Sequence, residues 1–291
     1  MNVINKIPGP FLIFMGALSL SFGGLIVKSF EGATLWQILF WRSLFFTMTI
    51  LAFLILTYKK KLFNSFYQSG LPGFFGGVIL SFGFCGYVFA MYNTTVANTN
   101  FIISTQILFL AVFGYLFLKE KISVITLASI ILAITGVLLM VGNSLSPGEM
   151  SGNLAAFSMP ITFAVLIMIV RKFPKVDMVP AQFIAGISSC LIGFLLSEKL
   201  MISSHDIFLG FTAGFFQVGF GFIFITIGAR STPSAMVGII MLSESVLGPI
   251  WAFLFAGERL SSFTLIGGGV ILCAVLLQFY SLLFIKKKTV N

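Results

Sequence analysis

One carboxylate lies within a long apolar stretch of the chain. The segment IIMLSESVLGPIW, residues 239–251, carries Glu244 near its middle, and the residues on both sides are also apolar. A charged side chain at the centre of a membrane-spanning helix costs roughly 2.5–3.5 kcal/mol on insertion-based scales. Such residues rarely face lipid. Three roles fit Glu244: contact with a polar ligand, binding of a proton, or a purely structural hydrogen bond between helices.

Arg42 is the other charged side chain well inside an apolar segment. Its planar guanidinium fork suits the recognition of a carboxylate. We therefore expect Arg42 to pair with Glu244 or with a carboxylate of a ligand. The alternative is that its long stem carries the charge outward to the lipid headgroups.

Further polar residues lie within the apolar segments and are expected to line a cavity together with Glu244 and Arg42. Taken singly, each also fits an ordinary hydrogen bond between helices. The tryptophan among them fits either the cavity or an interfacial anchor. These candidates are Gln106, Tyr87, Ser19, Ser21, Asn100, Ser104, Gln182, Gln217, Ser243 and Trp41.

The composition places these residues in a membrane. Of the 291 residues, 58% are hydrophobic and 9% are charged, whereas a soluble domain has about 25% charged residues. The net charge of +9 does not indicate nucleic-acid binding, because the basic residues cluster at the ends of apolar segments. The sequence therefore predicts an all-α, polytopic membrane protein.

The apolar segments predict ten transmembrane helices, since a span needs about 20 apolar residues. Continuous apolar segments favour helices over a β-barrel, whose strands alternate. The connections are too short to hold a soluble domain. The predicted spans are 10–27, 35–57, 71–92, 99–118, 122–141, 152–170, 180–197, 206–229, 234–256 and 263–285.

The distribution of Lys and Arg predicts the orientation, because cytoplasmic loops are enriched in both. With the N-terminus inside, only Lys28, Lys199 and Arg259 lie outside. An even number of spans then places both termini in the cytoplasm. The residues inside are Lys6, Lys59, Lys60, Lys61, Lys119, Lys121, Arg171, Lys172, Lys175, Arg230, Lys286, Lys287 and Lys288.

The chain contains an internal repeat. Residues 93–140 align with 231–278 at an offset of 138, which matches Glu120 to Glu258 and Gln106 to Glu244. The front parts correspond at an offset near 143. The predicted repeats are residues 1–146 and 147–291, with five spans each. Because five is odd, the second repeat is inverted, an arrangement frequent in secondary transporters.

These features resemble the drug/metabolite transporter superfamily, EamA-type family. The resemblance rests on the paired turns KEKIS (119–123) and GERLS (257–261), and on SLSFGGLIVKSF and ILFWRSLFF in the first two spans. It implies a ten-helix carrier that works by alternating access around a central cavity. The family often has a proline near the centre of the fourth and ninth spans. Here the fourth has Gln106-Ile107, and the ninth has Ser245 there, with Gly248-Pro249 one turn later to bend the helix.

The predicted function is a secondary transporter of a small polar metabolite, such as an amino acid or a related compound. The alternatives are a channel-like or non-transporting membrane protein and, with less support, an intramembrane lipid-modifying enzyme. An enzyme would need a clustered nucleophile, base or metal site, but the acids are scattered and His205 lies in a loop. We therefore predict no enzymatic activity and no catalytic residues.

The expected partners follow from this reading. They are a small-molecule substrate and the lipid bilayer. In the role in which Glu244 binds a proton, a coupling proton is a further partner. We expect no nucleic acid, no metal and no cofactor, and a monomer or weak homodimer. The expected location is the inner (plasma) membrane of a bacterium. Glu120 and Glu258, at span ends, are expected to be solvated and to shape short turns.

Overall fold

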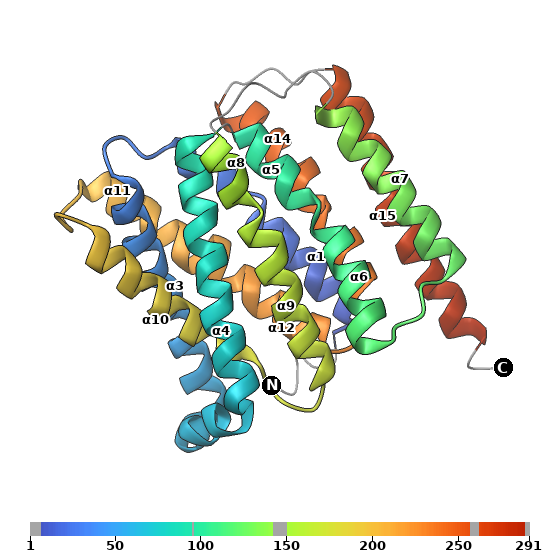
Figure 1. The fold of residues 1–291 in the computed structure, drawn as a ribbon, viewed down its shortest axis with the longest axis horizontal. Helices are drawn as coiled ribbons and strands as arrows, with labels where there is room; N and C mark the ends of the chain where they lie inside the picture. Colours follow the sequence, from blue (N-terminus) through green and yellow to red (C-terminus); the bar gives the residue numbers. More distant parts are fainter. Residues whose placement is uncertain (1–6, 95, 142–149, 257–261, 289–291) are drawn as a thin grey trace.

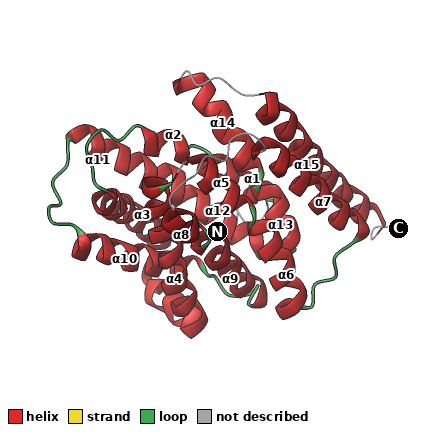
Figure 2. Ribbon diagram, turned by 45° about the horizontal axis from the view of Figure 1, so that its top comes forward, coloured by secondary structure: helices red, strands yellow, loops and turns green. Residues whose placement is uncertain are grey.

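The computed structural model describes residues 7–94, 96–141, 150–256 and 262–288. Within these ranges the chain folds into helices, and no strand is present (Figure 2). Helices satisfy the backbone of apolar segments internally, as a bilayer requires. The elements are α1 (Gly9–Leu20), α2 (Gly23–Lys28), α3 (Leu35–Tyr58), η2 (Lys59–Lys61), α4 (Leu62–Asn93), α5 (Val96–Ser104), α6 (Gln106–Leu118), α7 (Val124–Val141), α8 (Met150–Ala156), α9 (Ser158–Lys172), α10 (Val179–Leu196), α11 (Ser204–Phe211), η3 (Thr212–Phe220), α12 (Gly221–Ala229), α13 (Ser234–Met241), α14 (Ser243–Ala256) and α15 (Ser262–Lys288).

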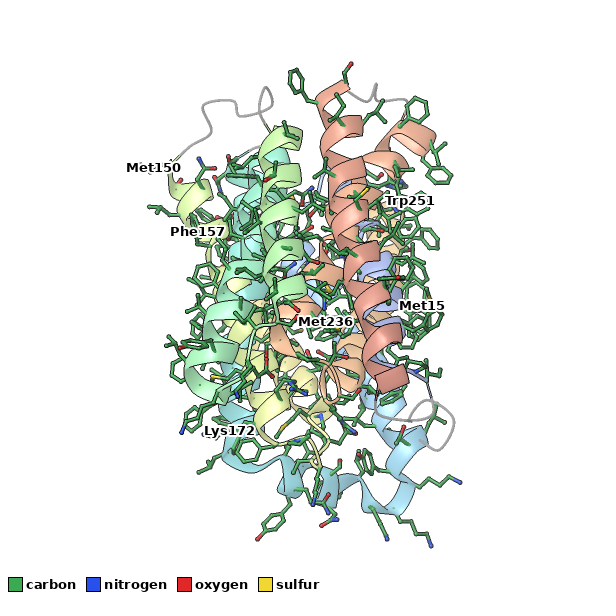
Figure 3. The ribbon with its side chains drawn as sticks, turned by 90° about the vertical axis from the view of Figure 1, so that its right-hand side faces the viewer. Met15, Met150, Phe157, Lys172, Met236 and Trp251 are labelled. Carbon is green, nitrogen blue, oxygen red and sulfur yellow. The ribbon has the colours of Figure 1, made fainter. Side chains whose placement is uncertain are left out.

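Seven helical segments are long and apolar enough to cross a membrane, judged by length and composition within the described residues. Large apolar side chains also cover the outside of the bundle (Figure 3); Phe63 and Val124, for example, are more than 80% exposed. The chain is therefore an integral membrane protein. Two shorter apolar helices are Val124–Leu139 and Leu265–Tyr280. The seven longer segments are Gly9–Val27, Leu35–Asn93, Thr99–Leu118, Met150–Lys172, Val179–Leu196, Ser204–Ala229 and Ser234–Phe255.

The segment Leu35–Asn93 has 59 residues and turns back on itself. Its backbone reverses at Lys59, a non-glycine residue with φ of 48°, between α3 and α4. A second break follows at Gly70, whose φ of 53° and ψ of −156° a side chain would disfavour. The predicted third span, 71–92, therefore begins directly after a break that needs glycine.

The fourth and ninth predicted spans are each broken near the middle. The first break, at Thr105, separates α5 from α6, and the second, at Leu242, separates α13 from α14. No proline is needed at Thr105, where the hydroxyl donates 2.6 Å to the carbonyl of Ile102. The bend expected at Gly248-Pro249 is displaced, because the break lies about two turns earlier and α14 continues through Pro249.

Helices that are equivalent in the two repeats pack against each other. α7 lies alongside α15 at one edge of the bundle, and α3 packs on α10 (Figure 1). α6 packs on α13. Two further contacts correspond to each other through the repeat: α4 packs on α9 in the same way as α12 packs on α1. Each half thus covers apolar faces of the other, and the bundle has a pseudo-two-fold arrangement.

The contact between α1 and α12 depends on small residues. A Cβ added to Gly16 would lie 2.5 Å from Cγ1 of Ile225, and one added to Gly228 would lie 2.9 Å from Cγ1 of Ile13. Helices in membranes approach closely where such residues remove side-chain bulk. The buried core around this contact includes Ile13, Ile225 and Phe222.

Candidate substrate-binding site

A pocket lies among the helices of both halves. Its polar lining comes from Arg42, Tyr87, Gln106, Gln217 and Glu244. The structure therefore brings together five residues that the sequence nominated separately. The apolar lining consists of Leu20, Phe84, Ile103, Met159, Phe163, Val218, Phe222 and Met241.

Arg42 is buried, and its guanidinium lies over two aromatic rings. Its central carbon is 5.4 Å from the ring centroid of Phe84 and 5.3 Å from that of Tyr87. The two rings are one turn apart on α4, so one face of each ring contacts the guanidinium. Cation–π contact of this kind is worth about 0.5–2 kcal/mol. The charge points into the pocket, so the alternative of reaching the outer headgroups is wrong.

Glu244 lines the same pocket from the first turn of α14. The break at Leu242 puts this carboxyl at the N-terminal end of a helix, where the backbone dipoles favour a negative charge. Among the residues that the structure describes, neither Glu244 nor Arg42 has an ion pair or a hydrogen bond from its side chain. The expected pairing of Arg42 with Glu244 is thus absent from this conformation.

Gln106 is the first residue of α6 and lies next to the break at Thr105. It is buried and lines the pocket with Glu244, its counterpart in the repeat. A second contact joins the two broken helices nearby, because the hydroxyl oxygens of Ser104 and Ser245 are 2.8 Å apart. The two helix breaks therefore meet at the pocket.

Gln217 reaches the pocket from η3, a nine-residue π-helix. Its Nε2 donates 3.3 Å to the carbonyl of Leu20, the last residue of α1. π-Helical turns occur frequently at functional sites. This bond holds the side chain at the edge of the pocket and ties η3 to the end of α1.

Other nominated residues lie outside the pocket lining, and several of them have partners elsewhere. Ser19 and Ser243 are buried, and the hydroxyl of Ser243 has no partner among the described residues; Asn100 is half-buried, with its carbonyl accepting from Ser104. The paired groups are Ser21 with Leu18 and Trp251, Gln182 with Thr226, and Trp41 with the carbonyl of Leu200.

Sequence reasoning missed the aromatic wall of the pocket. Phe84 packs edge-on against Phe46 and Phe222, with ring centroids 5.4 and 5.1 Å apart, and Phe163 meets Phe222 at 6.1 Å. With 36 Phe in the chain, no pattern marked these rings. The nearest signal was the spacing of Phe84 and Tyr87, which puts both on one face of a helix.

The described residues contain no group of three or more His, Cys, Asp or Glu side chains placed to hold a metal ion. The pocket offers a cation, an acid, two amides and a phenol beside apolar walls. This set can bind a small molecule that carries both charges and an apolar body.

Two comparisons show what the chain is similar to. An uncharacterized transporter of Methanothermobacter thermautotrophicus is 27% identical over 207 residues, which cover 65% of this chain and 58% of that protein. A crystal structure of another protein shares the fold with a TM-score of 0.76, at 16% identity, over 92% of this chain and 95% of the other.

A family comparison matches nearly the whole chain, in two parts. The profile of the EamA-like transporter family matches residues 7–142 and again residues 146–280. The resemblance drawn from the paired turns and the first two spans is confirmed. The chain therefore belongs to the EamA-like transporter family, within the drug/metabolite transporter superfamily.

Proposed function

We propose that this protein is a secondary transporter for a small zwitterionic metabolite with an apolar body, such as an amino acid. One observation carries the proposal: Arg42 and Glu244 line one pocket without partners among the described residues. Arg42 would bind the carboxylate through its fork, and Glu244 would accept from the ammonium group. Phe163, Phe222 and Met241 would receive the apolar part.

Alternating access around this pocket accounts for the arrangement of the helices. Residues from both halves line the pocket, so rocking of one half against the other would expose it to each side in turn. Dividing Leu35–Asn93 at Lys59 and adding the two shorter apolar helices supports ten membrane crossings. The two family matches, at 7–142 and 146–280, support two five-helix repeats.

The proposed location is the inner membrane, with both termini in the cytoplasm. The excess of Lys and Arg at one set of helix ends supports this orientation. Reporter fusions after Leu196 and at the C-terminus test it, because the first should report the outside and the second the inside. The opposite pattern would refute the orientation.

The proposed function is tested with purified protein in two steps. A thermal-shift screen of zwitterions, simple anions and simple cations identifies ligands, because a ligand of the native state raises the unfolding temperature. Counterflow in proteoliposomes then measures exchange of the best ligand. We expect stabilisation by apolar zwitterions and saturable counterflow. Conductance far above carrier turnover would instead support a channel, and product formation without translocation would support an enzyme.

A coupling proton is the alternative ligand of Glu244. Counterflow separates the two roles, because exchange of substrate at equal pH on both sides needs no net proton movement. A Glu244→Gln variant that exchanges normally but no longer accumulates substrate along a pH gradient would assign the carboxyl to the proton. Loss of exchange as well would assign it to the substrate.

A further inference from the structure

An ion pair joins the two halves at the end of the bundle that carries Lys59–Lys61. Oε1 of Glu120 lies 2.7 Å from Nη2 and 2.8 Å from Nε of Arg171. Glu120 follows α6 of the first half, and Arg171 lies near the end of α9 in the second half. The two nitrogens bind one oxygen together, so the pair has a defined geometry.

A second ionic contact lies beside the first. Arg230, after α12, pairs with Asp177 in the connection before α10. The hydroxyl of Tyr58, at the end of α3, donates 2.5 Å to Oδ2 of Asp177. The backbone N–H of Val179 donates 3.1 Å to Oδ1 of the same carboxylate. Asp177 thus connects three helix ends from both halves.

The two contacts form one network. Nη1 of Arg171 donates 3.1 Å to the carbonyl of Arg230, and Oε2 of Glu120 accepts a 2.8 Å bond from the backbone N–H of Ser234 at the start of α13. The expectation that Glu120 is solvated is therefore wrong; its counterpart Glu258 lies outside the described residues. We call the network the inner clamp, which comprises Tyr58, Glu120, Arg171, Asp177 and Arg230.

The inner clamp is better shielded than an ordinary surface ion pair. The side chains of Glu120 and Arg171 are 16% and 21% exposed, and those of Asp177 and Arg230 are 9% and 15% exposed. Exposed pairs contribute little to stability, whereas partly buried pairs with several hydrogen bonds are costly to break singly. Joining one helix to the next does not by itself require such a shielded network of ion pairs.

The helices that carry the inner clamp also line the pocket. At 1.5 Å per residue, Gln106 and Leu118 are separated by about 18 Å along α6, and Glu120 follows two residues later. Along α9, Phe163 and Arg171 are separated by about 12 Å. α3, α12 and α13 likewise hold a pocket residue in the membrane and end at or beside the clamp. The clamp therefore lies between the pocket and one face of the membrane.

Contacts between the halves at the opposite end differ in kind. There, Asp206 accepts from the backbone N–H groups of Glu31 and Gly32, at 3.1 and 3.3 Å. Within the described part of the chain, the ion pair that joins the halves lies at the clamp. Opening the clamp end would thus separate opposite charges, whereas opening the other end would break bonds to backbone.

We propose that the inner clamp is the cytoplasmic gate of the transport cycle and holds this conformation closed to the inside. The gate rests on the proposed alternating access, and the experiment below reads accessibility rather than transport. Loss of one clamp charge destabilises the closed arrangement, so the inward-open state gains population. Substrate affinity at the pocket should change less than the rate of cycling.

The test measures how fast the pocket can be reached from the cytoplasmic side. Cys85, Cys190 and Cys273 are replaced by serine, and Met241, an apolar residue of the pocket lining, is changed to cysteine. Inside-out vesicles are treated with a membrane-impermeant maleimide. We expect Arg171→Gln and Glu120→Gln to label about tenfold faster, which corresponds to about 1.4 kcal/mol lost from the closed state.

Three further variants control for charge, folding and side-chain geometry. Lys172 is exposed at the end of the same helix and points outward (Figure 3), so Lys172→Gln should label like the parent. Tyr58→Phe removes only the hydroxyl and should give a smaller increase, which keeps the test available if the Arg171 variant fails to fold. Arg171→Lys should lie between the parent and Arg171→Gln.

Equal labelling rates in the parent, Arg171→Gln, Glu120→Gln and Tyr58→Phe would overturn the gate. Rapid labelling of the parent from the inside would do so as well, because the clamp would then not close the pocket. If zwitterions do not bind the pocket, these labelling rates stay the same, since the labelling assay contains no substrate. The gate and the proposed function therefore fail separately.

Discussion

Gln106 and Glu244 occupy corresponding places in two broken helices. Each lies in the first turn after a break, Gln106 after Thr105 and Glu244 after Leu242, and both line one pocket. A carboxyl and an amide thus face the same space from the two halves. The repeat gives the pair its symmetry, and the difference between the side chains makes the pocket asymmetric in charge.

Substitution of Glu244 tests the acid in the pocket. We expect Glu244→Gln to reduce counterflow of a zwitterion about ten- to hundredfold, because a hydrogen bond to a charged group is worth about 1.5–3 kcal/mol. The measurement is initial rate in proteoliposomes, with folding checked by thermal unfolding. Glu198, an exposed acid, provides the control Glu198→Gln. Wild-type rates and wild-type pH dependence in Glu244→Gln would exclude the carboxyl from the mechanism.

Substitutions of Arg42 distinguish what its positive charge contributes to ligand binding from what its planar guanidinium contributes. Arg42→Lys keeps a cation but loses the planar fork and much of the stacking on Phe84 and Tyr87. We expect Arg42→Gln to abolish stabilisation by ligands in thermal-shift assays and Arg42→Lys to retain a small part of it. The control ligand is an amine without a carboxylate, which should bind both variants alike. Equal stabilisation of Arg42→Gln and the parent by a zwitterion would contradict the assigned role.

Phe84 is predicted to act through Arg42. Phe84→Leu removes one ring beneath the guanidinium, so the apparent KM should rise about two- to thirtyfold, in line with a cation–π contribution of about 0.5–2 kcal/mol. Maximal rate should change less. Phe63, which is 87% exposed, supplies the matched control Phe63→Leu. A loss of maximal rate with unchanged KM would indicate a merely structural ring.

The close contact between α1 and α12 predicts a steric effect on stability. Gly228→Ala adds a methyl 2.9 Å from Cγ1 of Ile13, and overpacking of this kind costs about 1–3 kcal/mol. We expect a lower unfolding temperature in detergent. Gly269→Ala, in α15, meets nothing within 4 Å and should leave the temperature nearly unchanged. An unchanged or raised unfolding temperature in Gly228→Ala would contradict the steric effect, because alanine favours a helix more than glycine does.

Much of the fold follows from sequence because apolar length and basic ends are local properties. The apolar segments predicted the membrane-spanning helices, and the paired turns at Glu120 and Glu258 indicated the family that the profile confirms. Internal breaks were harder to place. Thr105 and Leu242 lie inside long, mostly apolar segments. Only the structure, with local hydrogen bonds such as that from Thr105 to Ile102, shows where each helix is interrupted.

The sequence by itself determined that Arg42 and Glu244 lie within the membrane, since depth depends on distance along a helix. It did not determine which way either side chain points, because that depends on helix rotation and on neighbours far away in the chain. Tertiary structure placed Arg42 over Phe84 and Tyr87 and left it unpaired with Glu244. It also joined Glu120 to Arg171, residues whose opposite charges meet only because α6 and α9 pack side by side.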